Sequence, residues 1–291
     1  MPIKIAAAII HGIGEQKQDF AVGMINEVTK RFSDLIKYQS PNPAGELVMV
    51  PVYWAPVLQD EENTLWNRLR KGGDLDFVGL RRFMVNFAAD AIAYQPAPKE
   101  RDAYDKIHVK VAQALRQLAT DAGPDVPLVM IAHSLGTVIV SNYLYDLQRD
   151  TRKKLIPRVI RKEMGDTSLE RGETLTSVYT FGSPIALWSL RYEDFGRPIT
   201  VPSPKLATNH PGLEKASEWI NFYDKDDVIG YPLRQLNDAY RAAVTEDRQV
   251  NAGGLLSSWN PLSHNGYWTD NDVTKPIAAG LARVWRRANG L

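Results

Sequence analysis

Ser134 is the residue of this sequence whose surroundings most clearly indicate chemistry. Residues 128–136 have the sequence Leu-Val-Met-Ile-Ala-His-Ser-Leu-Gly, an apolar run followed by a serine between small residues. A helical pattern begins at Thr137, so the segment predicts a strand, a sharp turn and a helix, with Ser134 at the turn. A serine hydroxyl is a weak nucleophile, and such a turn lifts it clear of the backbone, where a base can reach it. The segment therefore predicts a nucleophilic serine.

The small residues on either side of Ser134 support this interpretation. The usual pattern for the turn is G-x-S-x-G, and here it is Ala132-x-Ser134-x-Gly136. Strand and helix pass close together at such a turn, and alanine, with one added methyl group, is the mildest replacement for the first glycine. The helix that follows directs backbone N–H groups toward the serine. The alternative is an ordinary strand-to-helix turn that happens to contain a serine.

A nucleophilic serine needs a base, and the sequence has five histidines. His264 lies C-terminal to every other candidate, where a chain order of serine, acid and histidine requires the base. His133 adjoins the serine, so its side chain is expected to point away from the hydroxyl. His11 is interpreted as ordering its own loop, and His108, inside a helix, as structural or exposed. His210 lies in a turn and is a weak candidate.

The acid that orients the base is expected just after a strand. The segment Asp224-Lys225-Asp226-Asp227 offers three carboxylates there. Asp227 precedes an apolar pair, so its side chain is the best placed to turn inward and accept a hydrogen bond from the base. Asp226 is the alternative acid, although Asp224 and Asp226 beside Lys225 are more typical of a solvated turn. The ligand spacing of a calcium loop is missing, so no metal is expected.

The oxyanion of an acyl-transfer reaction needs two backbone N–H donors. One is Leu135, the residue after the nucleophile, and the second is expected from a loop that follows an early strand. The segment His11-Gly12-Ile13-Gly14 fits, with Ile13 as the donor and Gly12 as the fallback. A dinucleotide-binding loop is excluded here because the third glycine of that pattern is missing.

Apolar runs alternate along the chain with helical patterns. This alternation predicts an α/β fold whose mostly parallel sheet is covered by helices on both faces. In such sheets ligands bind outside the carboxyl ends of the strands, where Ser134, His11 and Asp227 all lie. The expected strands are 3–10, 46–53, 127–132, 174–181 and 217–223, and the main helices are 17–38, 102–121, 136–149 and 273–287.

Five segments, in this order, resemble motifs of the α/β-hydrolase superfamily, and of lipase/esterase-like serine hydrolases in particular. They are the early His-Gly loop, Ala-His-Ser-Leu-Gly, Phe181-Gly182-Ser183-Pro184, Asp227-Val228 and Ser263-His264-x-x-Tyr267-Trp268.

The resemblance implies an α/β-hydrolase fold and a triad of Ser134, Asp227 and His264. Ile13 and Leu135 would form the oxyanion hole, and His11, Gly12, His133 and Gly136 would support the site. The implied activity is hydrolysis of a carboxylic ester or lipid through an acyl-enzyme, without a cofactor. Thioesterase or amidase activity would use the same machinery. A non-catalytic protein of this fold that binds a lipid or a partner is the further alternative.

Composition restricts the class of protein. The 291 residues are 44% hydrophobic and carry a formal net charge of +1, which favours one domain spanning 1–291 and argues against nucleic-acid binding. The absence of cysteine excludes disulfides and thiolate catalysis. No apolar stretch approaches the ~20 residues of a membrane span, and the N-terminus lacks the pattern of a signal peptide. A cytoplasmic protein is expected.

Three segments interrupt the alternation: 54–101, 151–173 and 191–216. Within 54–101 an apolar stripe predicts an amphipathic helix that packs its stripe on the domain, with a cap over Ser134 as the sharper hypothesis. The basic run 152–162 is interpreted as a solvated face, with a patch for anionic lipid headgroups as the alternative. The stripe consists of Phe77, Leu80, Met84, Phe87, Ala91 and Tyr94, and the opposite face of Arg82, Asn86 and Asp90.

Overall fold

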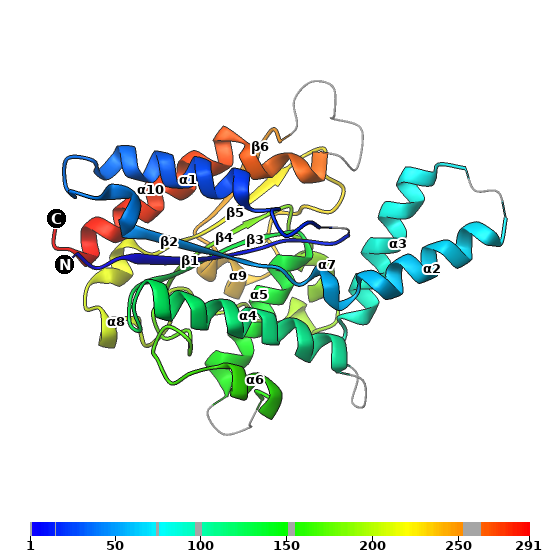
Figure 1. The fold of residues 1–291 in the computed structure, drawn as a ribbon, viewed down its shortest axis with the longest axis horizontal. Coiled ribbons are helices and arrows are strands. Elements are labelled where there is room, and N and C mark those ends of the chain that lie inside the picture. Colours follow the sequence, from blue (N-terminus) through cyan, green and yellow to red (C-terminus); the bar gives the residue numbers. More distant parts are fainter. Residues whose placement is uncertain (1, 15, 74–75, 97–100, 151–154, 253–262) are drawn as a thin grey trace.

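The fold is built around one six-stranded, all-parallel sheet, seen in a computed structural model of the chain (Figure 1). The strand order is β2-β1-β3-β4-β5-β6. The structure describes residues 2–14, 16–73, 76–96, 101–150, 155–252 and 263–291. The strands are β1 (Ile5–Ile10), β2 (Leu47–Val52), β3 (Leu128–His133), β4 (Leu175–Phe181), β5 (Trp219–Asp224) and β6 (Glu246–Val250).

Helices cover both faces of the sheet, which confirms the predicted α/β class (Figure 1). On one face, α1 (Val22–Ile36) and α10 (Asn271–Ala288) pack together over Ile5, Ala7 and Ile9. On the other, α4 (Asp102–Asp121) and α5 (Leu135–Arg149) pack over the intervening residues of the same strand. Burial on both faces is why β1 is apolar at every position and does not alternate.

The edge strand β6 was not expected from the sequence. Its residues, Glu-Asp-Arg-Gln-Val, are nearly all polar and mostly half-buried, because it pairs only with β5 in the described sheet. The hydrophobic pattern that reveals a buried strand is therefore missing. The remaining short helices are α6 (Arg158–Glu163), α7 (Ile185–Ser189), α8 (Leu206–Asn209) and α9 (Asp238–Ala243).

The inserted segment 54–101 contains two helices, α2 (Gln59–Lys71) and α3 (Val78–Ala93). They contact each other and project from the edge of the sheet at which the strands end (Figure 1). We refer to this helix pair as the hairpin. Only the second helix was predicted from the sequence.

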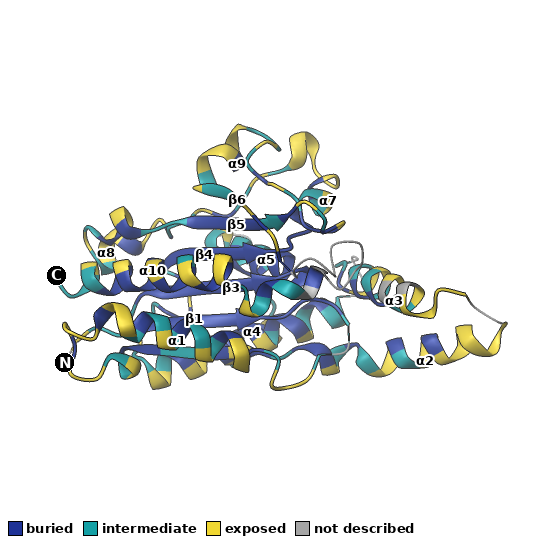
Figure 2. Ribbon diagram, turned by 90° about the horizontal axis from the view of Figure 1, so that it is seen from above, coloured by how far each residue is buried: buried dark blue, intermediate teal, exposed yellow. Residues whose placement is uncertain are grey.

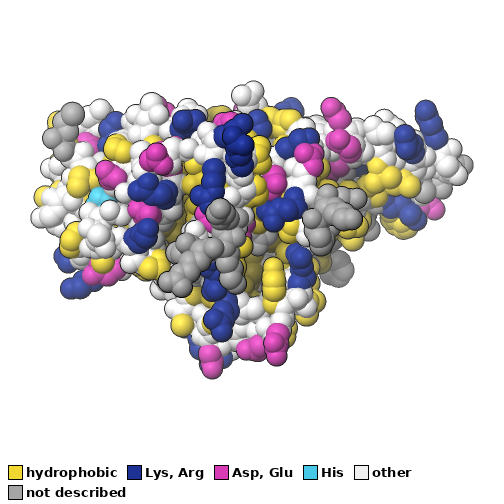
Figure 3. Space-filling view, turned by 90° about the horizontal axis from the view of Figure 1, so that it is seen from below, with side chains coloured by type: hydrophobic (Ala, Val, Ile, Leu, Met, Phe, Trp, Pro, Cys, Tyr) yellow, Lys and Arg dark blue, Asp and Glu magenta, His cyan; other side chains and the backbone are white. Residues whose placement is uncertain are grey.

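The predicted orientation of α3 is only partly correct, because Phe87 of the apolar stripe packs against the core as expected whereas other residues of the stripe do not. Asn86 and Asp90, assigned to its outer face, are 7% and 1% exposed, whereas Phe77 and Met84 of the apolar stripe are 77% and 50% exposed. Tyr94, after the helix, is buried as expected. Figure 2 shows exposed residues along the projecting hairpin, and Figure 3 shows apolar side chains among them. On this inward face Asp90 Oδ2 accepts a hydrogen bond from Gly14 N (3.2 Å).

The basic run 152–162 is described only in part, because 152–154 lie outside the described residues. Within it, Arg161 of α6 forms an ion pair with Asp150. The alternative lipid-headgroup patch stays a prediction. None of the helices in the described part of the chain has the length and apolar character needed to cross a bilayer.

Candidate active site

Ser134 lies at the junction between β3 and α5, in a strained backbone conformation. Its φ of 53° and ψ of −131° are unusual for a residue with a side chain, a strain that typically costs ~1–3 kcal/mol. Neighbouring groups hold it in place. Ser134 N donates to Phe181 O (3.0 Å), and Ser134 O accepts from Thr137 N (2.9 Å) and Thr137 Oγ1 (2.7 Å). The strand, turn and helix predicted around Ser134 are therefore present.

Two glycines allow the chain to pass close to this turn. A Cβ atom on Gly136 would lie 2.5 Å from His11 O, so only glycine lets α5 approach the end of β1 so closely. A Cβ atom on Gly12 would lie 2.3 Å from Ser134 Cβ and 2.9 Å from its Oγ. The loop after β1 thus rests directly against Ser134. Ala132, at the first position of the pattern, is buried in the sheet, which has room for its methyl group.

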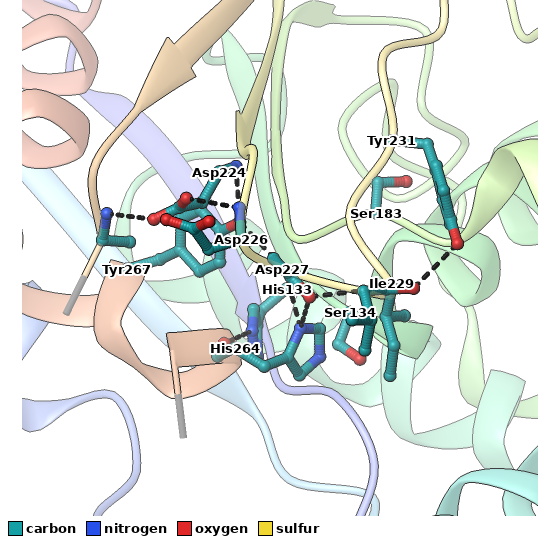
Figure 4. Close-up of polar contacts among 12 residues, drawn as sticks. His133, Ser134, Ser183, Asp224, Asp226, Asp227, Ile229, Tyr231, His264 and Tyr267 are labelled. Carbon is teal, nitrogen blue, oxygen red and sulfur yellow. Dashed lines mark hydrogen bonds and ion pairs between the residues drawn. The ribbon is translucent and has the colours of Figure 1, made fainter. Parts of the chain in front are cut away.

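His264 and Asp227 meet beside this turn. His264 Nδ1 lies 2.9 Å from Asp227 Oδ2 and 3.1 Å from its Oδ1, and both side chains are buried. Figure 4 shows the Asp227 carboxylate, the His264 ring and Ser134 next to one another in that order. Ser134 is fully buried, and its Oγ makes no hydrogen bond to the described part of the chain. The structure thus brings the three predicted triad residues together, with the hydrogen bond between histidine and acid formed.

The surroundings of Asp227 keep it ionised. Its burial alone would raise the pKa, but hydrogen bonds and the charge of His264 outweigh this effect and lower the pKa of Asp227 to about 2. Ile229 N donates to Oδ1 (3.0 Å) and the Tyr267 hydroxyl donates to Oδ2 (2.9 Å). The alternative acid, Asp226, is half-buried, and its N–H instead donates to Asp224 Oδ1 (2.9 Å).

Tyr267 is a functional residue whose part the sequence did not assign. Its hydroxyl donates to Asp227 and accepts a hydrogen bond from Asp224 N (2.9 Å), which ties the acid to the end of β5. Tyr267 follows His264 by three residues within the 3₁₀ helix Ser263–Thr269. Residues three apart in such a helix lie on the same side. That spacing was a usable signal for its role.

His133 supports the loop that carries His264. Its Nε2 donates to His264 O (2.6 Å), and its ring stacks on Phe181 and meets the edge of Trp268. Burial, followed by the charge of His264, lowers the pKa of His133 well below its ordinary value. His133 is therefore neutral at physiological pH and serves as a fixed donor to the backbone of His264.

Two further glycines leave room for the acid and the base. Gly182 has φ +56°, and a Cβ atom there would lie 3.0 Å from His264 Cε1 and 3.1 Å from Asp227 Oδ2. A Cβ atom on Gly230 would lie 2.7 Å from the same carboxylate oxygen. A side chain at either position would displace the pair.

Gly182→Ala is expected to lower the kcat of any reaction that depends on the His264–Asp227 contact by at least about tenfold, because it displaces both side chains. Alanine at positive φ is also strained, so the free energy of unfolding should fall by roughly 1–2 kcal/mol. Thermal unfolding and initial rates measure the two effects. Gly79→Ala is the control, because a Cβ atom there meets nothing within 4 Å. Unchanged kcat in the Gly182 variant would contradict the steric argument.

The two predicted oxyanion donors belong to segments that adjoin Ser134. Leu135 is the first residue of α5, where backbone N–H groups have no partner within the helix. Ile13 belongs to the loop that contacts Ser134 through Gly12. Within the described residues, neither N–H donates a backbone hydrogen bond outside regular strands and helices. Both stay predicted donors to a developing negative charge.

His11 fixes the start of this loop. Its Nε2 accepts hydrogen bonds from Trp54 N (3.1 Å) and Ala55 N (3.3 Å), and its Nδ1 lies 2.8 Å from Gly12 O. The ring stacks on Trp54, and burial lowers the pKa of His11 to about 3. A neutral ring with Nδ1 protonated satisfies all three contacts. These contacts fit the structural role expected for His11.

The remaining histidines lie outside this cluster. His108 is buried in α4, where its Nε2 lies 2.9 Å from the Tyr94 hydroxyl, and burial lowers its pKa to about 3. His210 follows α8 and contacts Asp125 O. Neither residue contacts Ser134, so neither is placed to act as its base.

A cavity of about 670 Å³ lies along α5. Val138, one helical turn beyond Ser134, forms part of its wall, but none of the triad residues does. Polar, charged and aromatic side chains line the rest of it, among them Asn142, Tyr145, Arg149, Trp188, Tyr192 and Asn237.

Comparisons with known proteins do not place the chain in a family. A scan against models of known protein families found no match. A search of curated proteins found no similar sequence. Within the described residues, no group of three or more histidine, aspartate or glutamate side chains is arranged to hold a metal ion. The fold is thus an α/β fold with an open parallel sheet. Inference about function depends on the arrangement of the residues around Ser134.

Proposed function

We propose that the protein is an α/β-hydrolase-type serine hydrolase that cleaves carboxylic esters. The observation that carries the proposal is the hydrogen bond between His264 and an ionised Asp227, placed beside a serine in a strained strand-to-helix turn. This combination supports a nucleophile, a base and an orienting acid in one cluster. In the proposed triad Ser134 follows β3, Asp227 follows β5, and His264 lies in the 3₁₀ helix before α10.

In the proposed reaction, Ser134 Oγ attacks the ester carbonyl while His264 Nε2 takes its proton. The tetrahedral oxyanion is held by the N–H groups of Ile13 and Leu135. His264 then gives the proton to the leaving alcohol, and the acyl group remains on Ser134. Water, deprotonated by His264, attacks the acyl-enzyme, and His264 then returns that proton to Ser134 Oγ as the carboxylic acid leaves. Asp227 stabilises the imidazolium that forms in each half-reaction.

The substrate proposed is a small-molecule ester or a lipid. Thioesters and amides undergo the same steps at the same groups, so they belong to the same proposal as alternatives. In this conformation Ser134 and His264 are buried, and substrate entry therefore requires the groups that cover them to move.

A second candidate function is a non-catalytic α/β-hydrolase-fold protein that binds a lipid or a partner. The observation that favours it is the Ser134 hydroxyl, which makes no hydrogen bond to the described part of the chain. Against it stands the formed contact between His264 and Asp227. Catalytic hydrogen bonds are often long before substrate binds, so the hydrolase proposal is preferred.

Labelling with a fluorophosphonate probe tests the proposal. The folded protein is expected to be labelled, with the modification found on Ser134 by mass spectrometry, and heat-denatured protein is expected to remain unlabelled. Ser183, another buried serine near the site, serves as an internal control because its hydroxyl is bound to Thr137 Oγ1 (2.8 Å). Lack of labelling, together with no turnover across a panel of esters of increasing acyl length, would favour the non-catalytic alternative.

A further inference from the structure

The inward face of α3 contains a buried acidic contact that the proposed reaction does not use. Asp90 and Glu62 of α2 are both buried. Burial raises the pKa of Asp90, while hydrogen bonds with the Glu62 carboxyl and with Gly14 N act in the opposite direction. Burying a carboxyl group is costly unless polar partners offset its loss of water. A hydrogen-bonding contact is needed to offset the cost of burying the Asp90 carboxyl group.

That contact is with the loop after β1. Asp90 Oδ2 accepts a hydrogen bond from Gly14 N (3.2 Å). Gly14 has φ +83°, and the amide nitrogen of Asn86 lies 3.4 Å from where its Cβ atom would be. The inward polar face of α3 therefore rests on Gly14, the residue that follows the proposed oxyanion donor Ile13.

The loop 11–14 is thus fixed at two ends by different parts of the molecule. At its start, His11 is bound to Trp54 and Ala55, directly after β2. At its end, Gly14 is bound to Asp90 on the hairpin, which projects away from the sheet (Figure 1). The Gly14 N–H shares a peptide plane with Ile13 C=O, so the bond to Asp90 restrains the backbone of Ile13.

We propose that Asp90 is a positioning residue that holds Ile13 N–H in its oxyanion-binding orientation and thereby links the hairpin to the active site. The proposal rests on the proposed hydrolase function. A displacement of the hairpin breaks the Asp90–Gly14 bond, so that the loop loses the anchor at its end and keeps the His11 bonds at its start and the Gln16 Nε2 bond to Ile13 O (3.2 Å). The hairpin then acts on the rate of reaction through the loop, without contact with the reacting atoms.

Asp90→Ser and Asp90→Asn test this role. Serine is too short to reach Gly14, so kcat should fall about 10- to 100-fold, somewhat less than the loss of an oxyanion donor itself, with KM within about threefold. The rate constant of fluorophosphonate labelling should fall in the same proportion. Asparagine keeps an oxygen acceptor for Gly14 N–H, so Asp90→Asn should retain kcat within about threefold of wild type.

Asp146→Ser supplies the matched control. Asp146 is a half-buried carboxyl on α5 that accepts from the Tyr104 hydroxyl (2.9 Å), away from the oxyanion loop. Its loss should lower the melting temperature but leave kcat unchanged. A folded Asp90→Ser protein that is labelled at the wild-type rate would overturn the proposal.

Hydrogen exchange of the Gly14 amide distinguishes the anchoring of Gly14 by Asp90 from its effect on catalysis. In Asp90→Ser the exchange at Gly14 should become faster, while exchange in β1 stays unchanged. Unchanged exchange at Gly14 overturns the anchoring whether or not the protein is a hydrolase. If wild-type protein is never labelled but Gly14 exchange responds as expected, the proposed hydrolase function fails, and the catalytic part of this role fails with it.

Discussion

Ser134→Ala is expected to lower kcat for ester hydrolysis by about 10⁶ and to abolish fluorophosphonate labelling, because the bond-forming oxygen is removed. The fold should survive. Ser134 Oγ makes no hydrogen bond to the described part of the chain, so its removal leaves no buried partner unsatisfied. The strained φ of 53° is equally unfavourable for alanine and serine. We expect the free energy of unfolding to change by less than about 1 kcal/mol.

Ser183→Ala is the matched control for this substitution. The Ser183 hydroxyl is bonded to Thr137 Oγ1 (2.8 Å) and accepts from Ile185 N (3.3 Å), so its loss should cost stability and leave labelling intact. The two serine variants should therefore show opposite patterns. Equal labelling of the wild-type and Ser134→Ala proteins would show that the probe reacts elsewhere and would refute Ser134 as the nucleophile.

The sheet could be predicted from the sequence where its strands are buried on both faces. The runs 3–10, apart from Lys4, and 127–132 are apolar, and they contain β1 and β3 in the centre of the sheet. The parallel arrangement followed from the alternation with helices. The strand β6 could not be predicted, because its side chains are nearly all polar. It is recognised only by the backbone hydrogen bonds that pair it with β5.

The hairpin shows where periodicity misleads. A helical stripe of apolar residues predicts that this face packs on the protein, yet Asp90 is buried and Met84 is half exposed. The cost of burying polar side chains is offset by specific partners, here Gly14 N for Asp90. Such partners are distant in sequence, so composition and spacing give no sign of them.

The proposed triad residues could be named from the sequence because their order and their positions after strands are properties of the sequence. The contacts made by the residues that support them could not be predicted from the sequence. Gly182 matters only because β4 lies beside β5, which brings its Cα close to Asp227. His133 was expected to point away from Ser134, but the carbonyl it binds, that of His264, lies 131 residues away in the chain. The contacts of Gly182 and His133 are visible only in the structure, and hydrolysis by the proposed triad stays a prediction.

Asp227→Asn is expected to lower kcat by about 10⁴ at neutral pH, with a small effect on KM. In the wild-type protein three donors converge on the carboxylate: His264 Nδ1–H, the Tyr267 hydroxyl and Ile229 N–H. These contacts help to lower its pKa to about 2, so it is fully ionised at neutral pH. An asparagine carboxamide offers one acceptor oxygen and an NH₂ group, so at least one donor would face another donor. The imidazole is then held in the wrong tautomer or turned away from Ser134.

Asp226→Asn is the control that makes this result specific. Asp226 has the same charge and precedes Asp227 directly, but it is half-buried and its backbone N–H binds Asp224. Its substitution should leave kcat within about threefold, because solvent screens a partly exposed charge. Initial rates measured for both variants at the same pH decide between the two acids. A larger loss at Asp226, or more than a tenth of wild-type kcat in Asp227→Asn, would contradict the assignment. A large loss of kcat in Asp227→Asn but not in Asp226→Asn would show that the charge which orients His264 is that of Asp227, whose carboxylate binds Tyr267 and Ile229.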